Sequence, residues 1–463
     1  MKRKLVVLDI VGLTPGLLGE NTPNLSALAS DGFQASLRGV FPAVTCSAQS
    51  TMLTGALPRT HGIVGNGWYY RDLAEVLFWR QSNRLVTAPK VWETLRERRP
   101  GFTCAKIFWW YNMYSTADWS ITPRPVYPAD GRKLPGIYAE PPELRQVIER
   151  ELGAFPFLSF WGPFSGLPST AWITRTARIV IERYAPDLTL AYLPHLDYDF
   201  QRFGPSDKRC RDRLLEVDRE AGELIRLARE RDMEVLAVSE YGLAHVDGSV
   251  SLNRELRRQG FLRVRDTAVG EMLDTGACRA FAAADHQVAH VYVRDTADVA
   301  AVKEILEATD GVDFVLDEEG KRQHGLDHPR SGELVAVATP TKWFDYYYWL
   351  DDERAPDFAR TVDIHRKPGY DPVELFLNPA MRLAKLRIFA KLVRMKLGFR
   401  TLLDVIPLDT SLVRGSHGRC AENARNGPLL ISSTKRLETS ELAMTDVAGF
   451  IQAVACGNAG FGD

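Results

Sequence analysis

Short apolar runs in the first half of the chain constrain the fold most strongly. They have the length of strands and no strict polar alternation, and they occupy residues 5–10, 104–110, 188–193 and 234–239. Segments with helical patterns separate them, including residues 22–32, 169–184 and 206–231. Strands buried on both faces lose alternation, and helical crossovers allow parallel pairing. The sequence therefore predicts an α/β fold, with a mostly parallel central sheet between two layers of helices.

Three acidic residues stand where predicted strands end. Asp9 closes the first run, Asp197 follows the third, and Glu240 follows the fourth. Ligands of parallel sheets bind beyond the carboxyl ends of the strands. We therefore expect these acids to lie close together at one edge of the sheet.

Residues 41–70 form a stretch with little charge and many hydroxyl groups and turn formers. A hydroxyl at a helix start, near a strand-end acid, indicates a nucleophile beside a metal ion. Local chemistry does not choose among the five candidates, which are Thr45, Cys46, Ser47, Ser50 and Thr51.

The pattern changes after residue 250. Residues 251–325 predict a small inserted α+β subdomain, between core segments 1–250 and 326–463. We expect core strands to resume at residues 333–338 and 429–432, and a last helix at residues 444–455.

A basic amphipathic helix is predicted over residues 380–402. Residues 381–400 hold seven Lys or Arg and no acid, with apolar residues at helical spacing. A solvated surface helix explains this pattern, and so does a lid or a helix that rests on anionic lipids.

Composition excludes several classes of protein. The 463 residues carry 58 basic and 59 acidic side chains, which gives no general argument for nucleic-acid binding. Six scattered cysteines lack metal-binding spacing and are expected to be reduced thiols. With no signal-like or spanning apolar run, we expect a cytoplasmic protein. Nothing indicates an oligomeric state.

Residues 42–66 follow the pattern PxxTxxxxxxxxTG, then a proline, HGI and an asparagine. Together with the strand-end acids, this pattern resembles the alkaline phosphatase superfamily, and within it the type I phosphodiesterase/nucleotide pyrophosphatase branch. The resemblance implies an alkaline phosphatase-like three-layer sandwich. It selects Thr45 as the nucleophile and makes Asn66 a phosphoryl contact. It also makes His61 a structural residue of the turn.

The resemblance also assigns metal ligands, with departures. Asp9 and Asp197 match acidic ligands, and His417 matches the family's last histidine. Gln201 stands where the family motif DxxxHxxGP has histidine. In SEYG, which matches SDHG, Glu240 replaces aspartate and Tyr241 replaces histidine.

Two divalent metal ions are implied, with zinc as the family's metal and manganese or iron as alternatives for a remodelled shell. Thr45 would also bind metal. Gln201 and Tyr241 are weaker zinc ligands than histidine. Spare histidines offer replacements, of which His365 is the candidate we include among the ligands, with His195 and His328 as further alternatives.

Arg330, Arg366 and Lys367 are candidates for binding a second negative group of the substrate. The resemblance thus predicts a metal-dependent hydrolase of phosphodiester or phosphomonoester bonds in a small phosphorylated substrate, acting through a phospho-threonine. The alternative is a metal-poor descendant without catalysis, which binds a phosphorylated metabolite or a partner.

Overall fold

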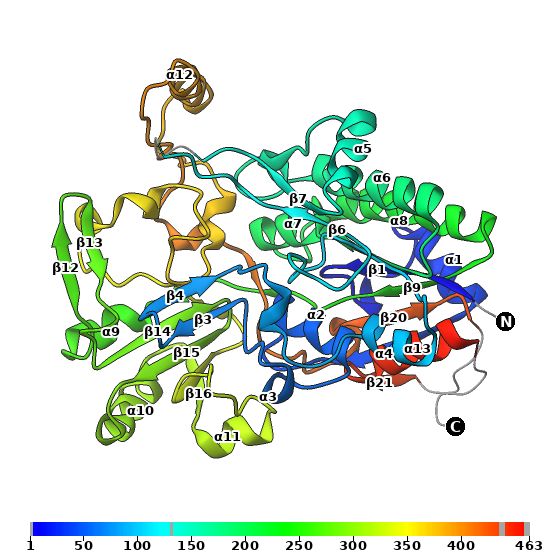
Figure 1. The fold of residues 1–463 in the computed structure, drawn as a ribbon. Helices are drawn as coiled ribbons and strands as arrows, with labels where there is room; N and C mark the ends of the chain where they lie inside the picture. Colours follow the sequence, from blue (N-terminus) through cyan, green and yellow to red (C-terminus); the bar gives the residue numbers. More distant parts are fainter. Residues whose placement is uncertain (1–2, 130–132, 435–439, 458–463) are drawn as a thin grey trace.

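A nine-stranded sheet forms the centre of the larger part of the molecule (Figure 1). The computed structural model describes residues 3–129, 133–434 and 440–457. In spatial order the strands are β21 (Glu441–Ala443), β2 (Phe33–Arg38), β20 (Leu429–Ser432), β9 (Met233–Val238), β1 (Lys4–Ile10), β8 (Leu188–Leu193), β5 (Cys104–Ile107), β6 (Trp119–Pro123) and β7 (Ile137–Glu140). The strands from β9 to β6 pair in parallel, whereas β20 and β7 run antiparallel to their neighbours. The predicted mostly parallel sheet is confirmed.

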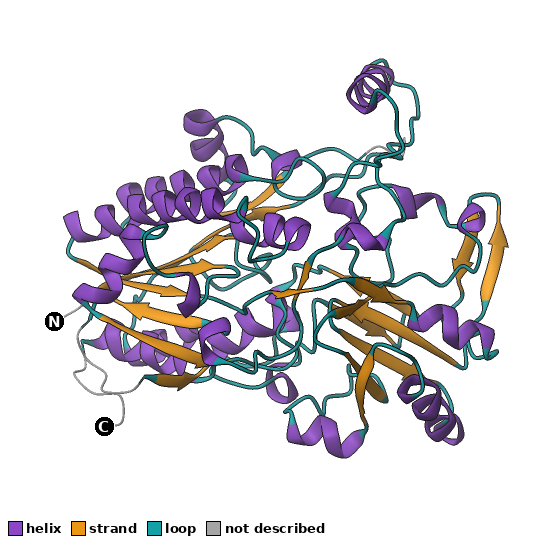
Figure 2. Cartoon of the chain, turned by 180° about the vertical axis from the view of Figure 1, so that it is seen from behind, coloured by secondary structure: helices purple, strands orange, loops and turns teal. Residues whose placement is uncertain are grey.

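Helices cover both faces of this sheet (Figure 2). One layer contains α1 (Pro23–Asp31), α5 (Glu143–Leu152), α6 (Leu167–Tyr184) and α8 (Cys210–Glu230). The other contains α2 (Thr45–Thr54), α4 (Val91–Arg98) and α13 (Asp446–Cys456). The apolar stripe of each helix therefore finds a partner in the sheet, as the sequence pattern requires.

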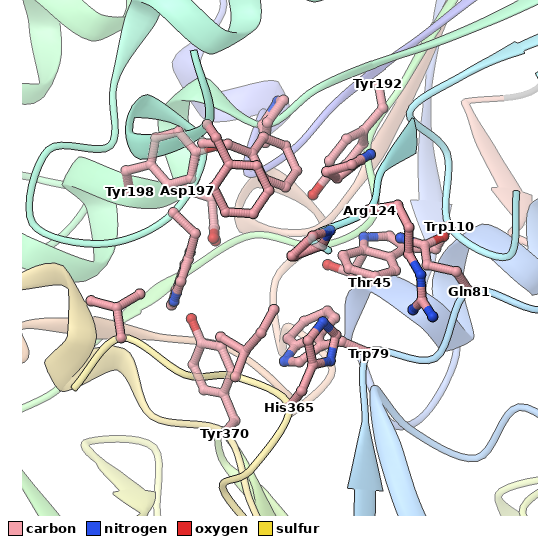
Figure 3. A pocket seen from close by; sticks show the side chains of 18 of the residues that line it. Thr45, Trp79, Gln81, Trp110, Arg124, Tyr192, Asp197, Tyr198, His365 and Tyr370 are labelled. Carbon is pink, nitrogen blue, oxygen red and sulfur yellow. The ribbon is translucent and has the colours of Figure 1, made fainter. Parts of the chain in front are cut away.

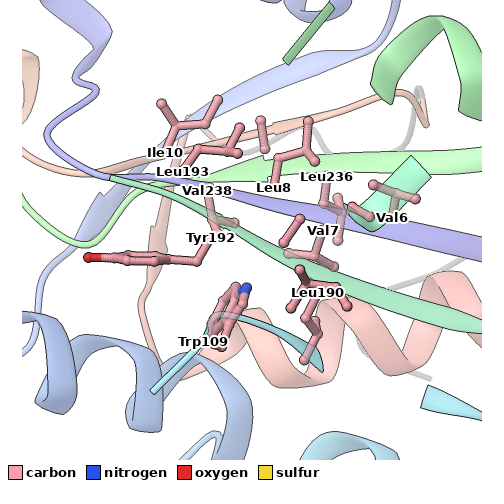
Figure 4. Close-up of a cluster of buried hydrophobic side chains, with 14 of the residues drawn as sticks. Val6, Val7, Leu8, Ile10, Trp109, Leu190, Tyr192, Leu193, Leu236 and Val238 are labelled. Carbon is pink, nitrogen blue, oxygen red and sulfur yellow. The ribbon is translucent and has the colours of Figure 1, made fainter. Parts of the chain in front are cut away.

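The central strands explain their lack of alternation. Every residue of β8 is buried, as is every residue of β1 after Lys4. Their side chains pack on both sides of the sheet against β9 and the flanking helices (Figure 4). Asp9 is the one acidic residue of these two strands, and it is completely buried next to the end of β1, at the carboxyl edge of the sheet.

A second sheet has its own apolar core. It is antiparallel in the order β14 (Ala280–Asp285), β15 (Val288–Val293), β17 (Leu334–Ala338) and β16 (Val312–Leu316), with α9 (Leu252–Arg258), α10 (Val299–Glu307) and α11 (Glu318–Gln323) beside it. We expected residues 333–338 to return to the central sheet, and this was wrong: β17 pairs with β15 and β16. An apolar run shows that a strand is buried, but not in which sheet.

Two further elements matter for the site. Helix α7 (His195–Phe203) follows β8 directly, and the hairpin of β3 (Gly67–Tyr70) and β4 (Glu75–Phe78) contacts the second sheet. Helix α12 (Ala384–Lys396) projects from the body of the molecule in both views. Across the described ranges, no helix is both long and apolar enough to traverse a bilayer.

Candidate active site

Thr45 is the first residue of α2 and lines a pocket at the carboxyl edge of the central sheet (Figure 3). The preceding Ala43 forms a β-bridge with Gly418, which fixes where the helix begins. The Thr45 Oγ1 atom lies 3.0 Å from the Tyr241 hydroxyl. The nucleophile candidate is therefore buried at a helix N-terminus and held by a phenol.

Asp9 and Glu240 meet behind Thr45, and the side-chain amide of Gln49 lies against both. Gln49 Nε2 donates to Asp9 Oδ2 at 3.0 Å and to Glu240 Oε1 at 2.7 Å. The backbone N–H of Trp110 donates to Gln49 Oε1 at 2.7 Å. That bond fixes the orientation of the amide, so its NH₂ group faces the two carboxyl groups.

Both carboxyl groups bind protons more tightly than usual. Burial, and then the charge of Glu240, raises the pKa of Asp9 well above its ordinary value. Burial also raises the pKa of Glu240, although hydrogen bonds with Asp9, Thr45, Gln49 and Tyr241 oppose the rise. Two adjacent buried carboxyl groups disfavour a second negative charge, so the pair shares a proton.

Asp197 and Gln201 stand one helical turn apart on α7. Gln201 Nε2 donates to Asp197 Oδ2 at 2.7 Å, and the Tyr370 hydroxyl donates to Gln201 Oε1 at 2.7 Å. Burial, followed by the charge of Glu240, raises the pKa of Asp197 to about 7. The other oxygen of Asp197 has no hydrogen-bond partner.

Four stacked rings form one wall of the pocket. Tyr241 stacks on His417 at 3.6 Å between ring centroids, and His286 stacks on Tyr370 at 3.6 Å; His417 and His286 join the two pairs at 3.7 Å, with their planes tilted by 36°. His417 Nδ1 lies 2.8 Å from the Ala43 carbonyl oxygen, and His286 Nδ1 lies 2.8 Å from Asp285 Oδ1. Burial holds the pKa of both imidazoles well below the usual value, so both rings are neutral.

Asn66 is held by protein groups. Its Oδ1 accepts from the Cys46 N–H at 3.0 Å, and its Nδ2 donates to Asp285 Oδ1 at 3.0 Å. It is not among the residues that line the pocket. This arrangement fixes the start of α2 relative to the second sheet, and the phosphoryl contact of Asn66 stays a prediction.

The three basic candidates lie outside the pocket lining and have protein partners. Arg330 donates to the carbonyl oxygens of Gly62 and Leu85, each at 2.7 Å. Lys367 is buried between Asp371 and Glu374, at 2.7 Å from each, and Arg366 lies 3.4 Å from Asp363. The basic residues that do line the pocket are Arg124 and Lys133.

Among the spare histidines, His365 lines the pocket, and burial lowers its pKa to about 4. His195 bonds Glu216 at 2.7 Å, and His328 Nδ1 accepts the Arg330 N–H, so both serve local structure. His61 bonds Thr51 within the turn, where a structural residue was predicted.

Sequence reasoning missed Gln49, Asp285 and His286. Asp285 ends the apolar strand β14, and an acid at a strand end is the signal that had identified Asp9. We overlooked it because we assigned this strand to the insert. For Gln49 the sequence offers no signal, since one glutamine in a helix is ordinary.

Solved structures share this architecture over nearly the whole chain. Phosphonoacetate hydrolase from Sinorhizobium meliloti, in complex with phosphonoformate, superimposes with a TM-score of 0.63 at 15% identity, covering 98% of this chain and 96% of that one. Human ectonucleotide pyrophosphatase/phosphodiesterase 5 gives 0.58 at 13% identity, covering 98% and 95%. An inactive variant of the murine protein, in complex with AMP, gives 0.57 at 14% identity, covering 100% and 97%. These likenesses establish the alkaline phosphatase-like fold.

The profile of the type I phosphodiesterase / nucleotide pyrophosphatase family matches residues 5–371, so the chain belongs to that family. The name of the family describes hydrolases of phosphodiester and pyrophosphate bonds. A curated relative, an uncharacterized pyrophosphatase/phosphodiesterase of Schizosaccharomyces pombe, is 25% identical over 233 residues. That match covers 48% of this chain and 41% of the relative.

The family is generally dependent on divalent metals, but these residues do not fit a two-metal centre. One oxygen each of Asp9, Glu240 and Asp197 accepts a hydrogen bond from an amide NH₂ group, whereas Asp9 Oδ1, Glu240 Oε2 and Asp197 Oδ1 are buried without a hydrogen-bond partner. An amide NH₂ donates and has no lone pair for a metal. Within the described part of the chain, no group of three or more His, Cys, Asp or Glu is placed to hold a metal ion.

Purified protein is therefore expected to contain less than stoichiometric zinc, manganese or iron after incubation with each metal. Gln201 and Tyr241 stand where the family motifs have histidine. The double variant Gln201→His with Tyr241→His should create zinc binding, because imidazole is a far better zinc ligand than an amide or a phenol. Elemental analysis after gel filtration measures both. Gln323→His, on an exposed helix, controls for histidine alone. If the unmodified protein holds a stoichiometric amount of metal that a chelator does not remove, the conclusion that these residues do not fit a two-metal centre is wrong.

Proposed function

We propose that this protein hydrolyses a phosphodiester or phosphomonoester bond of a small substrate whose organic group is apolar or aromatic, with Thr45 as nucleophile. The observation that carries the proposal is the position of Thr45 in the pocket, beside Glu240 and Tyr241. Two similar folds hold small phosphorus-containing molecules, phosphonoformate and AMP, which supports a small substrate.

The residues that line the pocket suit a substrate with an apolar or aromatic organic group. Aromatic side chains dominate it: Trp79, Trp110, Phe157, Phe160, Trp161, Tyr192, Tyr198 and Tyr370. Such rings bind apolar or planar groups by burial and stacking. Arg124 and Lys133 supply positive charge against the phosphate.

The proton transfer is assigned to Glu240. When its carboxyl group is ionised, it accepts the Thr45 proton as the oxygen attacks phosphorus; the P–O bond to the organic group breaks, and that group leaves as the alkoxide and takes a proton from solvent. The N-terminus of α2 favours the developing negative charge. Water then hydrolyses the phospho-threonine and restores Thr45. Because burial raises the pKa of Glu240, this base operates better as pH rises.

The second candidate function is binding of a phosphorylated ligand without turnover. Hydrogen bonds from the Gln49 amide to Asp9 and Glu240 favour binding without turnover, because they occupy carboxyl groups that would activate a nucleophile. The hydrogen bond between Tyr241 and Thr45 favours it as well, because it holds the nucleophile candidate itself.

Trapping the intermediate separates the two functions. We expect acid quenching during turnover of p-nitrophenyl phosphate to leave one phosphoryl group on the Thr45 peptide, and quenching with bis(p-nitrophenyl) phosphate to leave one p-nitrophenyl phosphoryl group, each detected by mass spectrometry. The Thr45→Ala protein provides the blank. Turnover without a labelled peptide would contradict the nucleophile, and saturable binding without turnover would establish the second candidate.

A further inference from the structure

Helix α12 has an apolar stripe that faces solvent. Leu386, Phe389, Val393 and Leu397 recur at the spacing that places side chains on one face of a helix. Their exposed fractions are 61%, 64%, 38% and 69%. Apolar residues of a surface helix ordinarily face the protein core. In α12 the apolar stripe faces solvent, where a solvated helix has polar residues.

The other side of the helix holds it to the protein. Ile388, 7% exposed, packs in a small cluster with Val405 and Ile406. A helix of 13 residues has little stability of its own. Its attachment therefore leaves the larger apolar face free while fixing the direction in which that face points.

Basic residues border the stripe. Arg387 and Arg394 lie along one border and Lys396 along the other, all exposed. Arg382 and Arg400 extend the charge beyond the helix ends, and no acid occurs in residues 381–400. Lys391 is neutralised by Asp404. Apolar side chains between rows of cations match a bilayer surface, with acyl chains below and anionic head groups on either side.

The pocket rim lies on the same side of the molecule. Val362 lines the pocket and also packs against the cluster that holds Ile388. Beside it, the segment carrying Arg124 and Lys133 exposes Val126 and Tyr127 at 54% and 47%. The charges of Asp363 and Arg366 act on Tyr127, which places this segment next to residues 362–366.

We propose that α12 docks this protein on anionic membranes, with its apolar stripe in the head-group region and its basic borders on anionic lipids. The helix is too short and too charged to span, so it lies in the plane of the surface. Docking in this way turns the pocket rim toward the bilayer. The inference does not rest on the proposed hydrolysis, because binding is measured without a substrate.

Co-sedimentation with vesicles tests the docking. We expect the whole protein to bind phosphatidylcholine vesicles containing phosphatidylserine at least about tenfold more tightly than phosphatidylcholine alone, and to be released by high salt. Phe389→Glu with Val393→Glu should weaken binding at least about tenfold, as should Arg387→Glu with Arg394→Glu. Melting temperatures verify that each variant is folded.

Matched controls change the same residue types elsewhere. Leu73→Glu with Val269→Glu alters exposed apolar residues, and Arg211→Glu with Arg226→Glu alters exposed arginines of α8; neither pair should change binding. The proposal is overturned if the unmodified protein does not bind anionic vesicles, or if the control variants reduce binding as much as the α12 variants do. It is also overturned if sedimentation velocity shows a dimer that does not bind vesicles and that Phe389→Glu with Val393→Glu dissociates, because a second copy of the chain then covers the stripe.

Discussion

Replacing Asp197 with asparagine is expected to stabilise the protein above neutral pH. Burial raises the pKa of Asp197 to about 7 from an ordinary value of 3.8. Between these values the folded state holds a proton that the unfolded state has lost, so stability falls as pH rises from about 4 to about 7. Asparagine resembles the protonated acid and avoids this loss. The difference in unfolding free energy between the Asp197→Asn variant and the parent should therefore grow by about 4 kcal/mol between pH 4 and pH 8.

Urea titrations at the two pH values measure this difference, and pH effects common to both proteins cancel. Asp199→Asn is the control on the same helix: Asp199 pairs with Arg202 and Arg213 at 2.7 Å each, so its loss should destabilise. A metal held by Asp197 would reverse the sign, because asparagine would then lower stability at pH 8. That result would contradict the metal misfit.

Thr45→Ala is expected to lower kcat/KM for p-nitrophenyl esters by about 10³-fold or more, since it removes the attacking oxygen. Thr45→Ser keeps a hydroxyl and should retain measurable turnover. Because the alanine also loses the hydrogen bond to Tyr241, the melting temperature must be compared with that of the serine variant.

Ser47→Ala provides a second comparison. Ser47 is buried two residues further along α2 and bonds the Ile63 carbonyl oxygen, so its replacement alters packing but not the proposed nucleophile. Full activity in Thr45→Ala would rule out the phospho-threonine. Equal losses in Thr45→Ala and Ser47→Ala would show that the effect is structural.

The central fold could be predicted because its physical signals are local. A strand buried on both faces is mostly apolar, as β1 and β8 are, and an acid at the end of such a strand is visible in the sequence. A helix start within the hydroxyl-rich residues 41–70 was likewise expected, and α2 begins there, at Thr45. Which sheet a strand joins is not local, and β17 was therefore assigned to the wrong one.

The candidate site could be predicted only where its residues carry chemistry themselves. Asp9, Asp197 and Glu240 were visible as acids, but the sequence does not show the burial that raises their pKa values or the hydrogen bonds that Gln49 and Gln201 donate to them. Glutamine is a common residue whose presence in a sequence signals no particular role. Here the Trp110 N–H donates to the Gln49 amide oxygen, and the Tyr370 hydroxyl donates to the Gln201 amide oxygen. These bonds orient the NH₂ groups of both glutamines toward the acids.

The four-ring stack joins parts of the chain that are distant in sequence. His286 lies between two strands of the second sheet, whereas Tyr241 follows β9 of the central sheet, and the rings of His417 and Tyr370 complete the wall. A fragment containing only the central sheet would lack the His286 ring and leave the faces of its neighbours open to water. The pocket wall therefore belongs to neither half alone, and severing the two sheets would leave two pieces without a binding site.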